Sequence, residues 1–405
     1  MKNNIYKLCI LLLVVIVTSC QEEFRGQYPI DNISPKPVFN VTVENLPGAV
    51  KIDYEIPDET DILYVKAEYE LSGGNHVFQK SSIFNNSMLI KGFSKSKKST
   101  LLLYTVDRSQ NVSEPVRVDI EPLDSPIYDI RNSLTVIESF GGVRVNWDNP
   151  LREEIMVGVL TKDSITGQFE NRENFYSSEM MANRSVRGMD STLITIGVFV
   201  RDIYMNFTDT LVLDVKPIFE EEIPKSNFSP LPLPSFVRLF NNNSTLQKIW
   251  DGNIFDETNY NFLYINPGNP MMPFFTFDMK VTAKFSRSKF WPRLRYAYTL
   301  HSPKIWEWWG TNDEVVARNN EDLNWESNPA WTKLMRCESK RPSGLDEGAP
   351  LTSEDTEYIE AGEEFEFPIE APAVRYVRFK LISSWSGSDG VNLQEVQFWG
   401  QIQKK

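Results

Sequence analysis

Apolar and polar residues alternate along several short runs of this chain, which is the pattern of half-buried β-strands. Two such runs, 50–54 and 143–147, follow a glycine turn and end before a proline, Pro57 or Pro150. A period of two places every second side chain on one face of a strand. The last third of the chain alternates in the same way, for example at 275–279, and shows no sustained helical period. We therefore expect an all-β chain.

The first half of the chain contains one pattern twice. The matching landmarks, 93 to 95 residues apart, are 48–54 with 141–147, Asp107 and Asn111 with Asp202 and Asn206, and 116–120 with 211–215. One spacing throughout indicates two copies of a module about the size of an immunoglobulin-like sandwich. In each copy the Asp-x-x-x-Asn element stands where a hairpin turn is needed. Asp and Asn side chains cap such turns, and we favour this role over the alternative of a metal site.

The N-terminus has the pattern of an export signal. Two lysines precede an unbroken apolar run of 10 residues, 8–17, whereas a membrane-spanning helix needs about 20. The run ends in Val-Thr-Ser-Cys at 17–20. This ending resembles a bacterial lipobox, which implies that residues 1–19 are removed and that Cys20 is lipidated. The alternative is an ordinary secretory signal with a chance cysteine.

The residues after Cys20 suggest where the protein is displayed. Gln21-Glu22-Glu23 looks like the surface-export signal of Bacteroidota lipoproteins. We therefore expect lipid anchoring to the outer membrane with exposure at the cell surface, and the periplasmic face is the alternative. The polar, proline-containing segment 20–37 is expected to be a tether.

Charge and composition exclude several functions. Lys and Arg number 42 and Asp and Glu 55, a net charge of −13, so nucleic acid is a poor partner. The only histidines, His76 and His301, lie far apart in the sequence, which argues against a histidine metal site and a histidine base. Three cysteines without a CxxC motif exclude a disulfide framework and a zinc ribbon. After processing, Cys337 is the one remaining free thiol, expected to be buried.

Prolines divide the body of the chain. Residues 221–235 carry alternating prolines, which favour a stiff polyproline II linker. The expected organisation is a signal peptide at 1–19, a lipidated cysteine and tether at 20–37, sandwich modules at 38–123 and 124–220, the linker at 221–235 and a third domain at 236–401. The two modules resemble the fibronectin-III-like spacers of Bacteroidota surface lipoproteins.

Nine of the ten tryptophans lie between Trp250 and Trp399, which assigns any stacking function to the third domain. The turn at 249–253, the strand at 304–313 and the closing strands at 375–379 and 391–400 resemble discoidin-like domains, also called coagulation-factor type C domains, of the galactose-binding-like fold. The resemblance implies a β-sandwich, or jelly roll, and is weak for the ligand.

The whole arrangement looks like the lipoproteins found beside polysaccharide-uptake systems in Bacteroidota. That implies a non-catalytic protein that binds polysaccharide or oligosaccharide at the cell surface. Its implied partners are an outer-membrane glycan importer and companion lipoproteins. A glycan-degrading enzyme with a carboxylate pair is one alternative, and a structural or adhesive surface lipoprotein is another.

Sugar recognition needs a flat aromatic face with polar groups around it. Trp306 and Trp308 share one face of a strand and are expected in the core. Trp291, Trp325 and Trp385 stand among Ser, Pro, Asn and Gly, so we expect them in loops, as the candidates to reach a glycan. The alternative is that each is buried, as tryptophans often are even in loops.

Cations surround one of these aromatic residues. Arg287, Lys289 and Arg293 lie in the stretch 286–293 around Trp291. Arginine forks suit carboxylate and sulfate groups, so these cations are candidates for binding an acidic or sulfated glycan. We favour the alternative that they only balance nearby acids.

The resemblance also implies a structural calcium site, although no cofactor is required. Discoidin-like domains often tie the opening turn to the final strand through Ca²⁺. The matching positions are Asp251, Asn253, Asp256 and Glu395. Oxygen ligands of this kind suit a hard cation. The alternative is a turn-capping Asp and a Glu without a metal.

Overall fold

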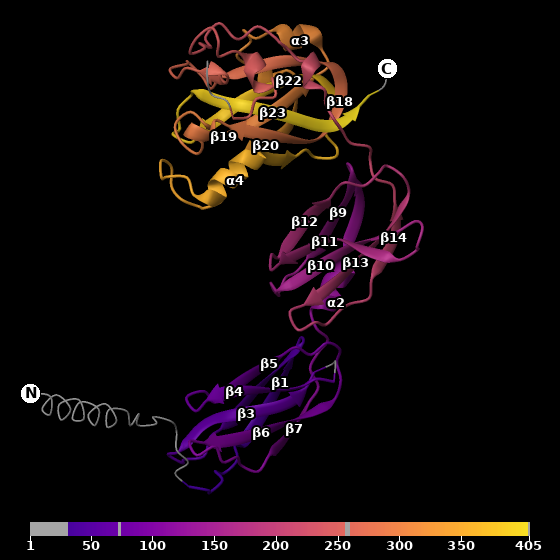
Figure 1. Ribbon diagram of the computed structural model, residues 1–405, viewed down its shortest axis with the longest axis vertical. Helices are drawn as coiled ribbons and strands as arrows, with labels where there is room; N and C mark the ends of the chain where they lie inside the picture. Colours follow the sequence, from indigo (N-terminus) through magenta and orange to yellow (C-terminus); the bar gives the residue numbers. More distant parts are fainter. Residues whose placement is uncertain (1–30, 72–73, 256–259, 404–405) are drawn as a thin grey trace, which may run out of the picture. The chain divides into compact units, whose positions relative to one another are not determined.

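The computed structural model of this protein describes residues 31–71, 74–255 and 260–403. Its strands form five sheets within these ranges. They fall into three groups that follow chain order, in indigo, magenta and orange to yellow (Figure 1). The expected all-β class is therefore confirmed, with two sandwich modules followed by a discoidin-like β-sandwich.

The first module consists of two sheets with three and four strands. Its strands are β1 (Phe39–Leu46), β2 (Ala49–Glu55), β3 (Ile62–Glu70), β4 (His76–Ser82), β5 (Ser87–Lys91), β6 (Ser99–Asp107) and β7 (Val116–Ile120). The sheet orders are β1-β2-β5 and β4-β3-β6-β7. Val50, Ile52 and Tyr54 are buried while the residues between them are less so. This alternation is the one that the sequence predicted.

The second module, preceded by α2 (Ile127–Ser133), repeats this order strand for strand. Its strands are β8 (Thr135–Ser139), β9 (Gly142–Asp148), β10 (Ile155–Lys162), β11 (Phe169–Ser177), β12 (Met181–Val186), β13 (Ile194–Asp202) and β14 (Leu211–Val215). The orders are β8-β9-β12 and β11-β10-β13-β14. Three strands in one sheet and four in the other is the division of a seven-stranded immunoglobulin-like or fibronectin-III-like sandwich. The shared topology confirms two copies of one module.

The repeated Asp-x-x-x-Asn element caps the same turn in both modules. The Asn111 N–H donates to Asp107 Oδ1 at 2.8 Å, and Asn111 Nδ2 donates to Asp107 Oδ2 at 2.9 Å. The Asn206 N–H and Nδ2 donate to Asp202 in the same way, at 2.9 and 2.8 Å. The expected turn-capping role is therefore confirmed.

The third module contains one nine-stranded sheet. Its strands are β15 (Glu221–Glu222), β16 (Ser229–Pro230), β17 (Leu263–Ile265), β18 (Phe274–Pro292), β19 (Pro303–Thr311), β20 (Thr332–Glu338), β21 (Glu363–Glu366), β22 (Val374–Ser384) and β23 (Val391–Ile402), and its short helices are α3 (Glu314–Arg318) and α4 (Ser353–Ala361). The main path runs β15-β23-β18-β22-β19-β20. Trp306 and Trp308, 0% and 1% exposed, lie in its core, as does Cys337. These three expectations are confirmed.

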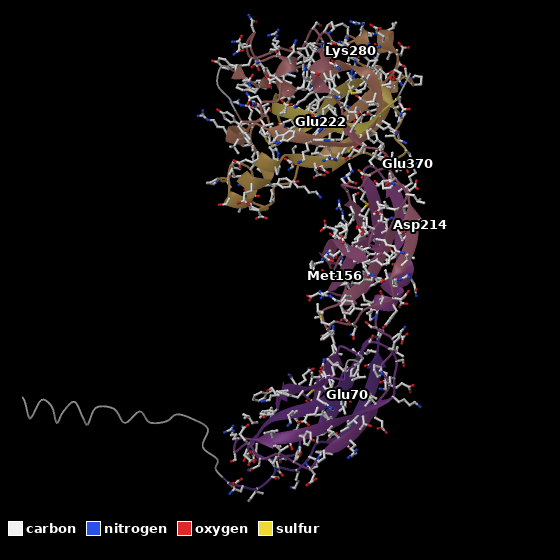
Figure 2. The ribbon with its side chains drawn as sticks, turned by 45° about the vertical axis from the view of Figure 1, so that its right-hand side comes forward. Glu70, Met156, Asp214, Glu222, Lys280 and Glu370 are labelled. Carbon is white, nitrogen blue, oxygen red and sulfur yellow. The ribbon has the colours of Figure 1, made fainter. Side chains whose placement is uncertain are left out.

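The segment 221–235 differs from the linker that its prolines predicted. Glu221 pairs with Gly400 through β15 and β23, and β16 pairs with β18. Figure 2 shows Glu222 among the strands of the group that also carries Lys280. Ile223 is fully buried. The apolar residues between the prolines bury themselves against the sheet, so this segment belongs to the third module.

The end of the expected tether is also fixed. Thr105 Oγ1 donates to the Lys36 carbonyl at 2.6 Å, and Asn111 Nδ2 donates to the Ile33 carbonyl at 3.1 Å. Residues 31–37 therefore lie against the first module. Cys20 and the acidic residues after it lie outside the described residues. Within the ranges that the structure describes, no helix is both long and apolar enough to cross a membrane.

Candidate functional site

Of the three tryptophans expected in ligand-binding loops, Trp325 is buried, at 1% exposure. Its ring lies edge-on to Trp309 and Trp331, with centroids 5.2 and 5.5 Å apart. The Arg378 guanidinium lies 4.5 Å from the same ring. A covered ring offers no face to a sugar, so the expectation that Trp325 reaches a glycan is wrong. The Ser and Asn residues around Trp325 suggested an exposed loop. In the structure the 3₁₀ turn η5 (Trp325–Ser327) packs its tryptophan into a second hydrophobic core, which also contains Trp309 and Trp331.

Trp291 and Trp385 are half-buried and lie against different partners. Trp291 Nε1 donates to the Glu360 carbonyl at 3.3 Å, and its ring covers Gly362, where an added Cβ would lie 2.5 Å from the ring. Trp385 lies edge-on to Tyr298 at 5.2 Å. The two rings therefore do not form one platform.

The three predicted cations separate in the structure. Arg287 Nη1 donates to Glu364 Oε2 at 2.8 Å and Nε donates to Glu220 Oε1 at 3.3 Å. Lys289 Nζ donates to the Ala361 carbonyl at 2.9 Å. Both cations are therefore already bound by neighbouring groups of the protein. Arg293 alone belongs to another group.

That group forms where β17, the end of β18 and the start of β23 meet. We call it the Tyr264 cluster and define it as Phe240, Tyr260, Phe262, Tyr264, Arg293, Tyr296, His301 and Asn392. The Arg293 guanidinium lies 3.5 Å from the centroid of Phe262 and 4.7 Å from that of Tyr296. Arg293 Nη1 also donates to Asn392 Oδ1 at 3.4 Å. The cation thus lies against two aromatic rings, of Phe262 just before β17 and of Tyr296 in the 3₁₀ turn after β18, and against a polar side chain of β23.

His301 forms the polar centre of the cluster. Its imidazole stacks on Tyr264, with centroids 5.6 Å apart and planes at 24°. The Asn392 N–H donates to the His301 carbonyl at 2.9 Å. Since β17 pairs Tyr264 with Asn392 of β23, the sheet register itself brings the three residues together.

Two aromatic rings of the cluster remain open. Phe240 and Tyr260 are 47% and 45% exposed. The Phe240 centroid lies 5.1 Å from Tyr264 and 5.7 Å from Tyr260. These two rings are the solvent-exposed aromatic part of the cluster.

Asp389 joins two of the surrounding loops. Its carboxylate accepts the N–H of Gly268 at 3.0 Å and the N–H of Asn269. Burial alone raises the pKa of Asp389, but these backbone N–H groups outweigh it, and the pKa lies below its usual value. An ionised Asp389 therefore holds the loop at 266–270 against the loop at 384–390.

Two titratable groups of the cluster, His301 and Tyr264, are neutral at pH 7. Burial lowers the pKa of His301 below 6.5, although the Asp389 carboxylate opposes the shift. Burial likewise raises the pKa of Tyr264, although Arg293 opposes the shift. His301 and Tyr264 therefore offer neutral hydrogen-bonding groups, and Arg293 adds a cationic donor to the cluster.

The predicted calcium ligands are Asp251, Asn253, Asp256 and Glu395, of which Asp256 lies outside the described residues. Glu395 is fully buried; its Oε1 lies 2.5 Å from Lys225 Nζ, and its Oε2 accepts the Gly252 N–H at 3.2 Å. Asp251 Oδ1 accepts the Asn253 N–H at 3.0 Å. Lys225 therefore supplies the positive charge opposite Glu395. Among the described residues, no three His, Cys, Asp or Glu side chains are grouped to hold a metal ion.

Sequence reasoning missed most of the Tyr264 cluster. The tryptophan-rich third domain favoured tryptophan as the stacking residue. A lone histidine in the sequence indicated neither a metal site nor a base, and it gave no sign of a binding role. One signal in the sequence could have indicated the cluster. Tyr260, Tyr264 and Tyr296 lie on either side of the predicted strand at 275–279 and are not part of its alternation.

Three family models match successive parts of the chain. They are the domains of unknown function DUF4959 at residues 35–122, DUF5126 at 123–226 and DUF5000 at 250–400. No curated protein matches the chain.

Solved structures offer further similarities. The chain resembles a SusE-like protein. The SusE-like structure is 29% identical, with a TM-score of 0.44, and the match covers 68% of this chain and 98% of that one. The C-terminal domain of a chitobiase from Bacteroides fragilis is 14% identical, covering 45% and 100% of the two chains, with a TM-score of 0.31. A family 32 carbohydrate-binding module of C. perfringens NanJ in complex with galactose is 12% identical, covering 44% and 98%, with a TM-score of 0.28.

Proposed function

We propose that this chain is a non-catalytic glycan-binding protein of the cell surface and that the Tyr264 cluster is its binding site. One observation carries the proposal: the Tyr264 cluster combines solvent-exposed aromatic rings with hydrogen-bonding side chains. Phe240 and Tyr260 are each nearly half exposed. Phe240 contacts Tyr264, which stacks on His301, and Tyr260 contacts Phe262, which lies under Arg293.

The chemistry of a sugar matches these two components. The C–H face of a pyranose stacks on an aromatic ring, while its hydroxyl groups need hydrogen-bonding partners at the edge. Phe240 and Tyr260 supply the rings. His301 and Arg293 supply the polar edge, and Asn392, 4% exposed, steadies Arg293 from behind.

The rest of the chain would present this site outside the cell. In the proposal, Cys20 carries the lipid anchor in the outer membrane and the two sandwich modules act as spacers. The third module then captures polysaccharide for an outer-membrane importer, together with companion lipoproteins.

A glycan array with the protein from Glu22 onward tests the binding function. We expect one glycan class to bind without release of sugar ends. Phe240→Ala should then weaken binding of that glycan by roughly 10- to 100-fold, the scale of a lost aromatic anchor. Phe78→Ala is the matched control, since Phe78 is 63% exposed on β4 of the first module, and it should bind as the wild type does.

The other outcomes identify the alternatives. Release of new sugar ends would identify a glycan-degrading enzyme. Binding of no glycan would favour an adhesive or structural surface protein. Equal binding by the Phe240→Ala variant would place the site elsewhere in the chain.

Anchoring and display need a separate experiment in cells. Cys20→Ala should leave an unlipidated precursor and remove the protein from the membrane fraction. Protease treatment of intact cells should digest the wild-type protein if it is displayed outside. Full protection of a membrane-bound protein would place it on the periplasmic face.

A further inference from the structure

The loop from Ser384 to Gly390 lies beside the polar centre of the Tyr264 cluster. We propose that Ser388 is a positioning residue that fixes the tautomer of His301, so that the Nε2–H of His301 serves as a hydrogen-bond donor to the bound glycan. This inference rests on the proposed glycan-binding function of the cluster.

Ser388 Oγ has polar neighbours in His301, Ser384 and Gly390. Ser388 Oγ lies 2.5 Å from His301 Nδ1. The Gly390 N–H points to Ser388 Oγ at 3.4 Å, and Ser384 Oγ donates to the Ser388 carbonyl at 2.8 Å. Ser384 Oγ also lies 3.2 Å from Ser388 Oγ.

In the proposed arrangement Ser388 is the donor toward the imidazole. The Ser384 hydroxyl proton is used on a carbonyl, and Gly390 supplies a donor to Ser388 Oγ. His301 Nδ1 is the nearest polar atom to Ser388 Oγ, so the proposal places the Ser388 proton on this contact rather than on the contact to Ser384 Oγ. A neutral imidazole whose Nδ1 accepts a hydrogen bond carries its own proton on Nε2.

The surroundings hold the ring in this state. Tyr264 covers one face of the imidazole. Gly390 lies against the ring so closely that an added Cβ would be 2.7 Å from His301 atoms. The acid facing His301 is Asp389, whose carboxylate accepts the N–H groups of Gly268 and Asn269. Asp389 thus has its hydrogen bonds satisfied by backbone groups of another loop.

The consequence is a defined polarity for the site. His301 presents an N–H donor at Nε2, so the ligand atom that it contacts is an acceptor. A sugar hydroxyl or ring oxygen, or the carbonyl of an N-acetyl group, meets this requirement.

Nitrogen-15 NMR of the imidazole tests the proposal directly, because the chain has only two histidines. His76, exposed on β4 of the first module, can be replaced as His76→Gln, which leaves His301 as the only histidine signal. We expect the neutral Nε2–H tautomer at pH 7.5. Ser388→Ala should give a mixture of the two tautomers. It should also weaken binding of the glycan selected on the array about tenfold, which is the effect of losing one hydrogen bond, here the bond from the His301 Nε2–H to the glycan.

Two further variants separate positioning from loop damage. Ser388→Thr keeps the hydroxyl and should restore both the tautomer and most of the affinity. Ser386→Ala removes a hydrogen bond from Ser386 Oγ to the Leu300 carbonyl in the same loop and should leave the tautomer unchanged.

An Nδ1–H tautomer in the wild type would overturn the proposal. So would an unchanged tautomer and affinity in the Ser388→Ala variant. Failure of the wild type to bind any glycan would instead overturn the proposed function, and the NMR spectrum would still report the tautomer by itself.

Discussion

His301 and Tyr264 stack with their ring centroids 5.6 Å apart and their planes at 24°. Tyr264 lies on β17, whereas His301 lies in the loop before β19. The stack therefore joins a strand that the sheet fixes to a loop that carries the polar centre. A binding site built in this way is organised before its ligand arrives, which reduces the ordering cost of binding.

The salt dependence of glycan binding distinguishes a neutral from an acidic glycan. Arg287 and Lys289 are already engaged by Glu364 and the Ala361 carbonyl. We therefore expect the affinity to stay nearly constant between low and high ionic strength. A steep fall of the affinity with rising salt, together with weaker binding by Arg287→Ala, Lys289→Ala and Arg293→Ala, would instead support an acidic or sulfated glycan as the ligand.

Truncation tests whether the segment 221–235 belongs to the third module. Because β15 and β16 pair with β23 and β18, a fragment of residues 221–405 should fold and bind glycan like the full protein. A fragment of residues 236–405 should unfold at a lower temperature, since it loses buried Ile223 and Leu231. Equal melting temperatures would return this segment to the role of a linker.

The tryptophans separate into stability and binding residues. Trp306→Ala and Trp325→Ala should each cost about 3–5 kcal/mol of unfolding free energy, because both leave a large cavity in a core. Both variants should bind glycan normally while they remain folded. Chemical denaturation measures the loss, and Phe78→Ala, on the open surface of the first module, is the control. A nearly unchanged midpoint for Trp325→Ala would place this ring on the surface instead.

Glu363 makes the stability of the third module depend on pH. It is 1% exposed, and burial raises its pKa to about 7 from an ordinary 4.5, although the Ser339 and Lys340 hydrogen bonds oppose the shift. The folded state thus keeps a proton that the unfolded state loses. Stability should be highest below about pH 4.5 on this account, fall up to about pH 7 and stay level above it.

The substitution Glu363→Gln removes this dependence. The variant should be more stable than the wild type at pH 8, by about 1–3 kcal/mol, and gain little at pH 4.5. Urea unfolding at the two pH values measures the difference. Glu357→Gln, on the exposed side of α4, is the control. An equal gain at both pH values would mean that Glu363 does not titrate between them.

Calcium removal tests the remaining metal prediction. The Lys225 ammonium lies 2.5 Å from Glu395 Oε1, so we expect a chelator to leave the melting temperature unchanged. In the Lys225→Ala variant the buried Glu395 carboxylate loses its cation, so the melting temperature of the variant should be lower than that of the wild type. A chelator-sensitive melting temperature in the wild type would support calcium at Asp251, Asn253, Asp256 and Glu395.

The local pattern predicted much of the fold. Alternation at Val50 and Ile52 marks a strand face because side chains of a strand point to opposite sides by turns. The repeat was also visible in the sequence. The turns at Asp107 and Asp202 are each recognised from a few neighbouring residues, and they lie at the same spacing as the other matching landmarks. Trp306 and Trp308 were placed in the core because they share one face of a strand.

Long-range pairing decided what this local pattern could not. Trp325 and Trp291 stand in similar polar stretches, yet one is buried and the other half-buried. The difference arises because η5 (Trp325–Ser327) turns its ring into a second core. Residues 221–235 likewise look like a linker until β23 and β18 pair with them.

The sequence by itself determined the all-β class, the repeated module, its capped turns and the tryptophan core. Each depends on residues within one strand or turn. Only the tertiary structure decided that Tyr264, His301 and Arg293 meet, because β17, the loop before β19 and the end of β18 come together through the pairing of β17 and β18 with β23. Sheet register is set by the whole core, so the candidate site appears only once the sheet is assembled.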